Sequence, residues 1–353
     1  MPSSEHRYIA KIKEWTSSSF IGDDCAILPG WGLVSSDTLV EGTHFRLDWT
    51  DLVSLGFKAC AVNLSDIAAM AGRPRFVTAA ITMPRDFGES ELRRLYQGMT
   101  DCATTYRTKI VGGDLTSGDK LVINLTVLGD IHECGVMKRS TAKAGQLVIA
   151  TGSFGASGAA LSLLNRQTEA NLSSLSSSRF RPGSPARFLL DAHFRPQPKL
   201  CQSWSMVRLT NGEGSLMDAS DGLADALVQI CQASQVDMEI DLDKIPVSAA
   251  VRQYAQVWQK DELAYALYGG EDYELVGTIS EAHWPALQES EGSFSVLGRV
   301  VEKSGAADIG SDAILDRASG DNRRRNVLFF EGGKRSKRLG GQADLSNCFQ
   351  HFW

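Results

Sequence analysis

Apolar positions over residues 33–130 follow the periods of strands and helices in alternation. Branched residues alternating with polar ones indicate strands, and apolar residues spaced three or four apart indicate helices. By these patterns we expect strands over 33–40, 75–83 and 121–129 and helices over 51–72 and 90–106. Residues 109–111 predict one more short strand, which leads into a Gly-Gly-Asp turn. Alternating strands and helices are typical of an α/β unit.

The pattern predicts a second unit after about residue 140. We expect strands over 146–150 and 215–217, and helices over 156–165 and after residue 222. A stretch rich in Ser, Arg and Pro over 171–198 predicts a long loop or irregular excursion around one short helix, and the polar residues 304–341 predict a flexible or edge segment. Because 353 residues exceed what one core usually organises, we expect two domains, 1–140 and 141–353, with one large domain as the alternative.

Composition excludes several classes of protein. The chain has 43% hydrophobic and 22% charged residues and no apolar run of 18 residues, so we expect no membrane span. Its first residues lack the apolar region of a signal peptide, which favours a cytoplasmic protein. The seven scattered cysteines indicate reduced thiols, and a net charge of −6 argues against nucleic-acid binding.

Aspartates gather in five short motifs, which we expect at the ends of strands or helices. The motifs are Gly22-Asp23-Asp24, Ser35-Ser36-Asp37-Thr38, Asn63-Leu64-Ser65-Asp66, Gly112-Gly113-Asp114 and Asp218-Ala219-Ser220-Asp221-Gly222. Clustered carboxylates repel one another unless cations lie among them, and such hard oxygen ligands favour Mg²⁺. A single Asp in a glycine-rich turn more often caps a helix, and Ser220 is a natural N-cap. Asp66 is different, because it lies in an apolar helix and would need a partner there.

Two glycine-rich segments complete the candidate chemistry. The run Gly269-Gly270-Glu271-Asp272-Tyr273-Glu274 allows a ligand to approach the backbone closely, although a tight turn is the simpler explanation. The glycines at 152, 155 and 158 could cradle a phosphate but lack the Gly-Lys-Ser/Thr ending of a P-loop. We interpret them as a structural turn.

Taken in order, these motifs resemble the thiamine-monophosphate kinase family. Its superfamily also includes aminoimidazole ribonucleotide synthetase, selenophosphate synthetase and a hydrogenase-maturation protein. The resemblance also runs through residues 36–45, 58–72, 138–140 and 218–225. It implies an α/β (α+β) fold of two domains, an N-terminal sheet that pairs with its twin in a homodimer, and a C-terminal α/β sandwich. It also implies ATP and several Mg²⁺ ions in a cleft between the domains.

The resemblance assigns roles to individual residues. Metal positions are Asp24, Ser35, Ser36, Asp37, Asp66, Asp114, Asp218 and Asp221. ATP positions are Tyr106, Gly113, Asp114, Arg139 and Ser220. Positions that touch thiamine monophosphate are His44, Glu271 and an aromatic near the carboxyl terminus, for which we choose Phe349. The family usually has Gly followed by Trp or Tyr there, so Cys348-Phe349 departs from the pattern.

The chemistry that this resemblance implies needs no nucleophile and no general base. A phosphate monoester has a second pKa of about 6, so its oxygen is already ionised near pH 7. We therefore expect direct transfer of the γ-phosphoryl group of ATP to thiamine monophosphate, giving thiamine diphosphate without a phosphoenzyme. The alternatives are another ATP-dependent enzyme of the superfamily and a nucleotide-binding relative without turnover.

Overall fold

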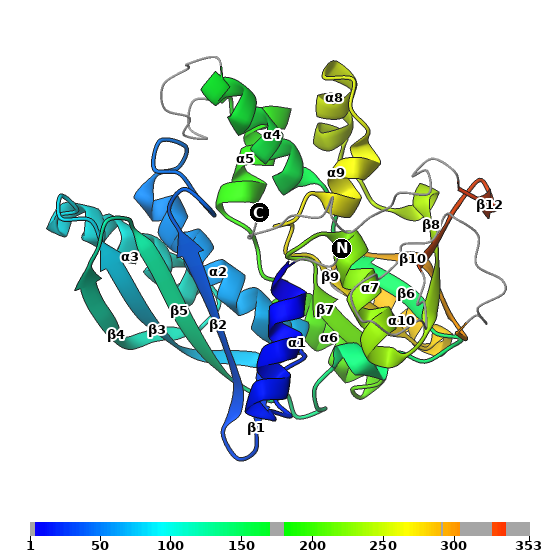
Figure 1. The fold of residues 1–353 in the computed structure, drawn as a ribbon. Coiled ribbons are helices and arrows are strands. Elements are labelled where there is room, and N and C mark those ends of the chain that lie inside the picture. The colour runs from blue at the N-terminus through cyan, green and yellow to red at the C-terminus, as the bar shows by residue number, and fades with distance from the viewer. Residues whose placement is uncertain (1–3, 170–179, 291, 304–326, 337–353) are drawn as a thin grey trace.

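Two separate β-sheets organise the computed structural model, which describes residues 4–169, 180–290, 292–303 and 327–336 (Figure 1). The first sheet has the order β1-β2-β5-β3-β4. Its strands are β1 (Ala26–Leu28), β2 (Gly32–Val40), β3 (Arg73–Met83), β4 (Lys109–Ser117) and β5 (Val122–Asp130). Strands β3 and β4 run parallel and the other neighbours run antiparallel, so the sheet is mixed.

Helices α2 (Leu52–Ala69) and α3 (Glu89–Thr105) cover one face of this sheet. Asp51 caps α2 by accepting hydrogen bonds from the backbone N–H groups of Val53 and Ser54. The two helices cross at Gly56 and Gly98, where a Cβ would lie 2.0 Å and 1.8 Å from the backbone oxygens of the facing helix. Glycine at both positions therefore lets the helix backbones touch.

Helix α2 is the central helix of the molecule. It lies between its own sheet and the second domain, so that it is buried on nearly all sides (Figure 1). Its 18 residues have the length and apolar composition of a membrane span, but 89% of them are buried inside the fold. Packing on all sides accounts for that composition.

The second sheet is also mixed and has the order β12-β11-β8-β10-β6-β9-β7. Its strands are β6 (Leu147–Thr151), β7 (Ser215–Asp218), β8 (Asp237–Asp241), β9 (Leu275–Ile279), β10 (Phe294–Val301), β11 (Val327–Glu331) and β12 (Lys334–Arg335). Helices α7 (Leu223–Ser234) and α9 (Glu262–Tyr268) pack on one face, and α6 (Leu200–Thr210) and α10 (Trp284–Gln288) on the other. Every residue of β6 and β9 is consequently buried.

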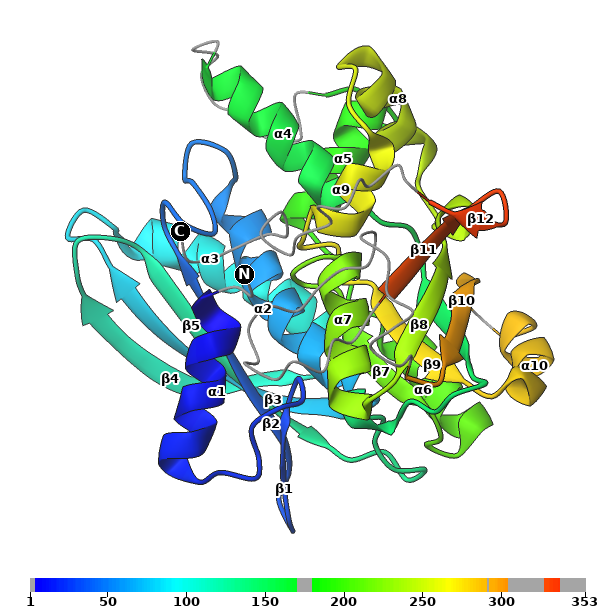
Figure 2. The ribbon, with the colours of Figure 1, turned by 45° about the vertical axis from the view of Figure 1, so that its right-hand side comes forward.

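The remaining helices lie around these layers. Helices α4 (Ala156–Glu169), α5 (Pro185–Phe194) and α8 (Ala249–Val257) share a small apolar core beyond the second sheet, and α1 (Ser4–Thr16) runs beside the first sheet (Figure 2). Short 3₁₀ turns occupy Arg139–Thr141, Leu242–Lys244 and Glu281–His283. The six cysteines among the described residues are all free.

The expected strands and helices are present, with ends shifted by a few residues, and three local expectations were wrong. Gly112-Gly113-Asp114 is no turn, because β4 continues through it to Ser117. Ser220 does not cap α7, whose N-cap is Gly222 without a side-chain hydrogen bond. Asp37 and Asp114 lie within strands, not at their ends. Part of the polar segment 304–341 does form an edge of the second sheet, as β11 and β12.

Candidate active site

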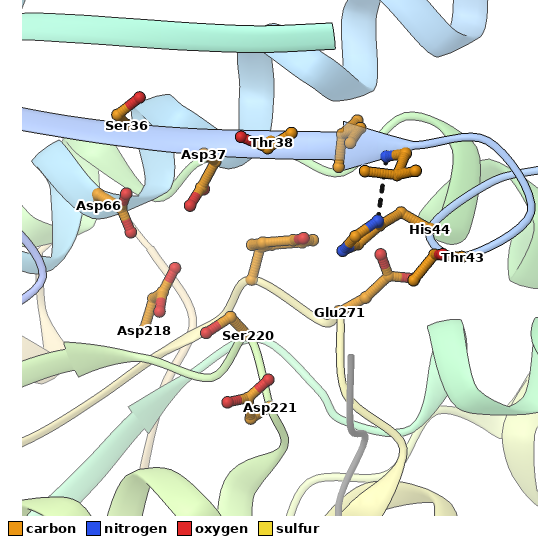
Figure 3. A pocket seen from close by; sticks show the side chains of 13 residues that line it. Ser36, Asp37, Thr38, Thr43, His44, Asp66, Asp218, Ser220, Asp221 and Glu271 are labelled. Carbon is orange, nitrogen blue, oxygen red and sulfur yellow. Dashed lines mark hydrogen bonds between the residues drawn. The ribbon is translucent and has the colours of Figure 1, made fainter. Parts of the chain in front are cut away.

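A pocket of ≈ 690 Å³ opens where the first sheet, α2 and the second domain meet (Figure 3). That volume suits a small-molecule ligand. Its walls come from β2 and the loop after it, from α2, from the end of β7, and from the loop between α9 and β9. The lining residues are Ser36, Asp37, Thr38, Leu39, Val40, Thr43, His44, Asp66, Asp218, Ser220, Asp221, Glu271 and Tyr273.

One end of the pocket is acidic. Carboxylate oxygens of Asp24, Asp66 and Asp218 lie within 4.8 Å of one another, and Asp37 projects beside Asp66 (Figure 3). The cluster joins residues that are far apart in the sequence, because α2 presents Asp66 between β2 and the end of β7. Among the described residues, this group has the hard oxygen donors that a divalent cation such as Mg²⁺ prefers.

Serines hold two of these carboxylates in place. Ser35 Oγ donates to Asp66 Oδ2 at 2.5 Å, and Ser65 Oγ donates to Asp218 Oδ2 at 2.6 Å. Ser35 therefore supports the cluster by holding Asp66. The Ser36 hydroxyl instead donates to the backbone oxygen of Leu125 and lies 3.1 Å from Thr126 Oγ1, both on the neighbouring strand. The hydrogen bonds from Ser35 and Ser65 stabilise the ionised forms of Asp66 and Asp218.

The electrostatics of the cluster show that its negative charge is incompletely balanced. Burial raises the pKa of Asp66 well above its usual value, and the charges of Asp37, Asp218 and Asp24 raise it further. Burial, followed by the charge of Asp24, likewise raises the pKa of Asp218 to about 7. Crowded carboxylates of this kind are stabilised by a cation.

Arg139 contributes a positive charge at the edge of the cluster. Its Nη2 donates to Asp24 Oδ1 at 2.6 Å and its Nε to Asp24 Oδ2 at 3.1 Å, a bidentate pair. Its Nη1 donates to Gln229 Oε1 at 2.5 Å. Burial alone would lower the pKa of Arg139, but Asp24 outweighs it and raises the pKa overall. The guanidinium therefore stays charged and fixed.

The opposite end of the pocket carries His44, Thr43 and Glu271 (Figure 3). The backbone N–H of Val40 donates to His44 Nδ1 at 3.0 Å, which fixes the imidazole against the end of β2. Glu271 is 4% exposed and forms an ion pair with Lys58, whose Nζ lies 2.9 Å from Oε1. This end of the pocket therefore carries the imidazole of His44 and the carboxylate of Glu271, whose negative charge is balanced by Lys58.

The loop that carries Glu271 has an unusual backbone. Glu271 and Tyr273 have φ angles of +53° and +51°, in the left-handed region that residues other than glycine rarely adopt. Such strain persists only where the surroundings fix it, and it concentrates at functional sites. The backbone N–H of Glu271 also donates to the oxygen of Ser220 at 2.5 Å, which ties the loop to the β7–α7 turn.

The other two carboxylates of this loop have structural partners. Asp272 accepts hydrogen bonds from the backbone N–H groups of Gly155 and Ser157 at the start of α4, at 2.7 Å and 3.2 Å. Glu274 accepts a hydrogen bond from Thr151 and pairs with Lys199. The carboxylate of Asp272 thus takes the backbone N–H groups that a phosphate could have used. This agrees with the interpretation of the glycines at 152, 155 and 158 as a structural turn.

Several residues predicted for the site lie elsewhere in this chain. Asp114 is on β4, in register with Ala80, Asn124 and Thr38 across three strand spacings of about 4.8 Å each. It is exposed on the sheet face away from α2, and Gly113 precedes it on the same strand. These residues are not brought to the acidic end of the pocket within one chain.

The three other predicted residues differ in their positions. Tyr106 ends α3, and its hydroxyl donates to Gln197. Asp221 lines the pocket and also groups with His6 and Asp225, whose side chains lie within 4.8 Å of one another. Phe349 lies outside the described residues.

Sequence reasoning missed three residues that support the site. Lys58 pairs with Glu271, His193 lies behind Glu271, and Ser65 bonds Asp218. Lys58 had a usable signal, because a single lysine inside an apolar helix needs a buried partner. His193 and Ser65 carried no comparable signal in the sequence.

Comparisons with known proteins agree with this arrangement. Two sequence families match, "AIR synthase related protein, N-terminal domain" over residues 22–131 and the corresponding C-terminal domain over 143–309. The thiamine-monophosphate kinase of Bacillus subtilis is 37% identical over 295 residues, covering 80% of this chain and 86% of that protein. The Escherichia coli K12 thiamine-monophosphate kinase is 36% identical over 280 residues, covering 78% and 81%.

A solved structure shares the whole fold. AaThiL complexed with AMPPCP and TMP superposes with a TM-score of 0.76 at 28% identity, and the match covers 94% of each chain. The two family matches together cover the first sheet, the second sheet up to β10, and every residue that lines the pocket. The chain therefore belongs to the thiamine-monophosphate kinase family, within the AIR synthase-related proteins.

Proposed function

We propose that this protein transfers the γ-phosphoryl group of ATP to the phosphate of thiamine monophosphate and so forms thiamine diphosphate. The observation that carries the proposal is the pocket with Asp66 and Asp218 at one end, where Asp24 lies within 4.8 Å of both, and His44 and Glu271 at the other, in a chain of this family. The acidic end suits metal-bound phosphates, and the opposite end suits the rings of thiamine.

Mg²⁺ fits the acidic end by the chemistry of its donors. Three carboxylates lie within 4.8 Å of one another, and the raised pKa values of Asp66 and Asp218 reflect negative charge that a cation would balance. Asp24, Asp37, Asp66 and Asp218 would hold the ions, with Ser35, Ser36 and Asp221 close by. When bound, Mg²⁺ would supply the charge that lets two polyanions approach each other.

The chain's own residues orient the reactants. In this proposal Arg139, which is paired with Asp24, binds the triphosphate together with Ser220, while His44 and Glu271 of the pocket wall orient the acceptor. The acceptor oxygen is ionised near pH 7, so no base need remove a proton. Transfer is direct, and no side chain becomes phosphorylated.

We also propose that the protein is a homodimer of two-domain chains, divided near residue 140. The sheet face away from α2 carries Phe76 and Leu128, which are 45% and 39% exposed and lie side by side in register. Pairing two such faces would cover this apolar surface. It would also bring Asp114 and Gly113 of β4 toward the ATP and metal site of the other copy.

The direct experiment is to incubate the protein with ATP, Mg²⁺ and thiamine monophosphate and to separate the products by chromatography. We expect thiamine diphosphate and ADP in equal amounts, and neither with excess chelator. ATP binding without product would contradict the proposal and favour a non-catalytic relative. Stable ³²P labelling of the protein after ATP alone would rule out direct transfer.

A further inference from the structure

The carboxylate of Glu271 is held from behind the pocket wall by two buried side chains. Lys58 Nζ lies 2.9 Å from Oε1, and His193 Nδ1 lies 3.4 Å from Oε2. The three side chains are only 2% to 5% exposed. Within the described part of the chain, Lys58 forms no other ion pair, so its charge compensates that of Glu271.

His193 is itself fixed by a further contact. Its Nδ1 lies 2.8 Å from Ser157 Oγ, which joins α5 to the first turn of α4. Burial, with the charge of Lys58 as the next cause, lowers the pKa of His193 to about 3. The imidazole is therefore neutral at pH 7 and restrains Glu271 without adding charge.

Helix α2 connects this group to the acidic end of the pocket. Lys58 and Asp66 are eight residues apart on the helix, which corresponds to about 12 Å along its axis. Asp66 and Glu271 lie toward opposite ends of the pocket (Figure 3). One buried helix therefore sets the position of a carboxylate at the phosphate end and, through Lys58, the position of Glu271.

We propose that Lys58 and His193 are positioning residues that fix Glu271 for the nitrogen-rich ring end of thiamine monophosphate, an inference that rests on the proposed function. An uncompensated carboxylate would leave a buried negative charge beside the acceptor, which itself carries a phosphate. Paired with Lys58, Glu271 adds no net charge and offers a directed hydrogen-bond acceptor. The pair also holds the left-handed backbone of Glu271 in place.

The test compares Lys58→Met, Glu271→Gln, the double variant and His193→Gln. We expect Lys58→Met to raise KM for thiamine monophosphate by about tenfold or more and to leave KM for ATP unchanged, because only acceptor orientation is lost. His193→Gln should change the same constant in the same direction. The matched control is Lys199→Met, which breaks the neighbouring Lys199–Glu274 pair outside the pocket and should leave both constants unchanged.

The double variant decides whether Lys58 acts through Glu271. If it does, Lys58→Met adds no further rise in KM once Glu271 is Gln. That comparison also holds if Lys58→Met alone folds poorly, because the double variant leaves no unpaired buried charge. The inference would be overturned if the rises in KM of the two single variants multiplied in the double variant, or if KM for ATP rose equally. Either result would leave the proposed function intact. A wild-type protein that makes no thiamine diphosphate would instead refute the proposed function, and this inference with it.

Discussion

Ser65 on α2 donates a hydrogen bond of 2.6 Å to Asp218 at the end of β7, and this bond joins the central helix to the second sheet at the acidic end of the pocket. Both residues are buried, with 0% and 1% of their surfaces exposed. The hydrogen bond opposes the effect of burial on the pKa of Asp218, because it stabilises the ionised carboxylate. The position of α2 and the charge state of the cluster are therefore linked.

Replacing Ser65 by alanine should weaken Mg²⁺ binding at the acidic cluster. The pKa of Asp218 would rise further above 7, so a larger fraction of the carboxyl group would be protonated at pH 7. We expect the Mg²⁺ concentration for half-maximal activity to rise severalfold at pH 7 and the difference to shrink at pH 8.5. Ser54→Ala on the same helix removes a hydrogen bond to Asp51 and should not change the Mg²⁺ requirement. If Ser65→Ala needed the same multiple of the wild-type Mg²⁺ concentration at both pH values, this explanation would be contradicted.

Without metal, Asp218 should make the protein less stable as the pH rises. Its pKa is about 7 in the folded chain and about 3.9 in an unfolded one, so the folded state binds more protons between these values. The contribution of Asp218 to the free energy of unfolding should then fall as the pH rises from 4 to 7, by on the order of 4 kcal/mol, and level off above.

Denaturant unfolding in chelator at pH 5 and pH 8 measures this effect. Asp218→Asn should lose less stability between the two pH values than the wild type and should be the more stable of the two at pH 8. Added Mg²⁺ should restore the wild type alone. Asp191→Asn, in a half-exposed pair with Arg187, serves as the control and should follow the wild type. Identical pH slopes for Asp218→Asn and the wild type would exclude Asp218 as the source.

Local patterns predicted the strands and helices, because each depends on residues close in sequence. Asp66 was singled out for the same reason, since a carboxylate in an apolar helix requires a partner nearby. Gly112 and Gly113 were misread as a turn, although a Cβ at Gly113 would lie 1.8 Å from the backbone oxygen of Ala79 on the next strand. That need for glycine arises from strand pairing and leaves no local signal. The pairing of Lys58 with Glu271 likewise joins distant segments.

Arg139 should separate nucleotide binding from metal binding. Arg139→Gln removes the bidentate contact to Asp24 and leaves a buried charge unpaired, which should cost about 3 kcal/mol of stability. We expect KM for ATP to rise about tenfold or more, because a guanidinium that can bind the triphosphate is lost. Mg²⁺ binding without nucleotide, measured by calorimetry, should not weaken, since Asp24 becomes free to bind the ion.

The control for Arg139 is a pair of the same type on the surface. Arg299→Gln breaks a bidentate contact with Glu281 outside the pocket and should leave KM for ATP unchanged. Adding Asp24→Asn to Arg139→Gln should recover stability without recovering ATP affinity. A parallel loss of Mg²⁺ and ATP binding in Arg139→Gln would mean that Arg139 only supports the fold.

The exposed sheet face should be the dimer interface. Phe76→Lys combined with Leu128→Lys places two charges in the apolar row formed by Val34, Leu128 and Phe76. We expect the variant to sediment as a monomer with unchanged far-ultraviolet circular dichroism and with little activity. Val257→Lys changes a residue on α8 that is 66% exposed, and it should remain dimeric and active. A monomeric variant with full activity would show that the site is complete in one chain.

Mixing two inactive variants should establish which copy supplies Asp114. In one chain Asp114 lies three strand spacings, about 14 Å, from the register of β2, so it should serve the metal site of the other copy. Asp114→Asn and Asp66→Asn should each be nearly inactive alone. In a mixed dimer, one site keeps Asp66 from one chain and Asp114 from the other, so mixing after gentle dissociation should restore activity. If Asp114 acted within its own chain, every site in the mixture would carry a substitution and activity would stay absent.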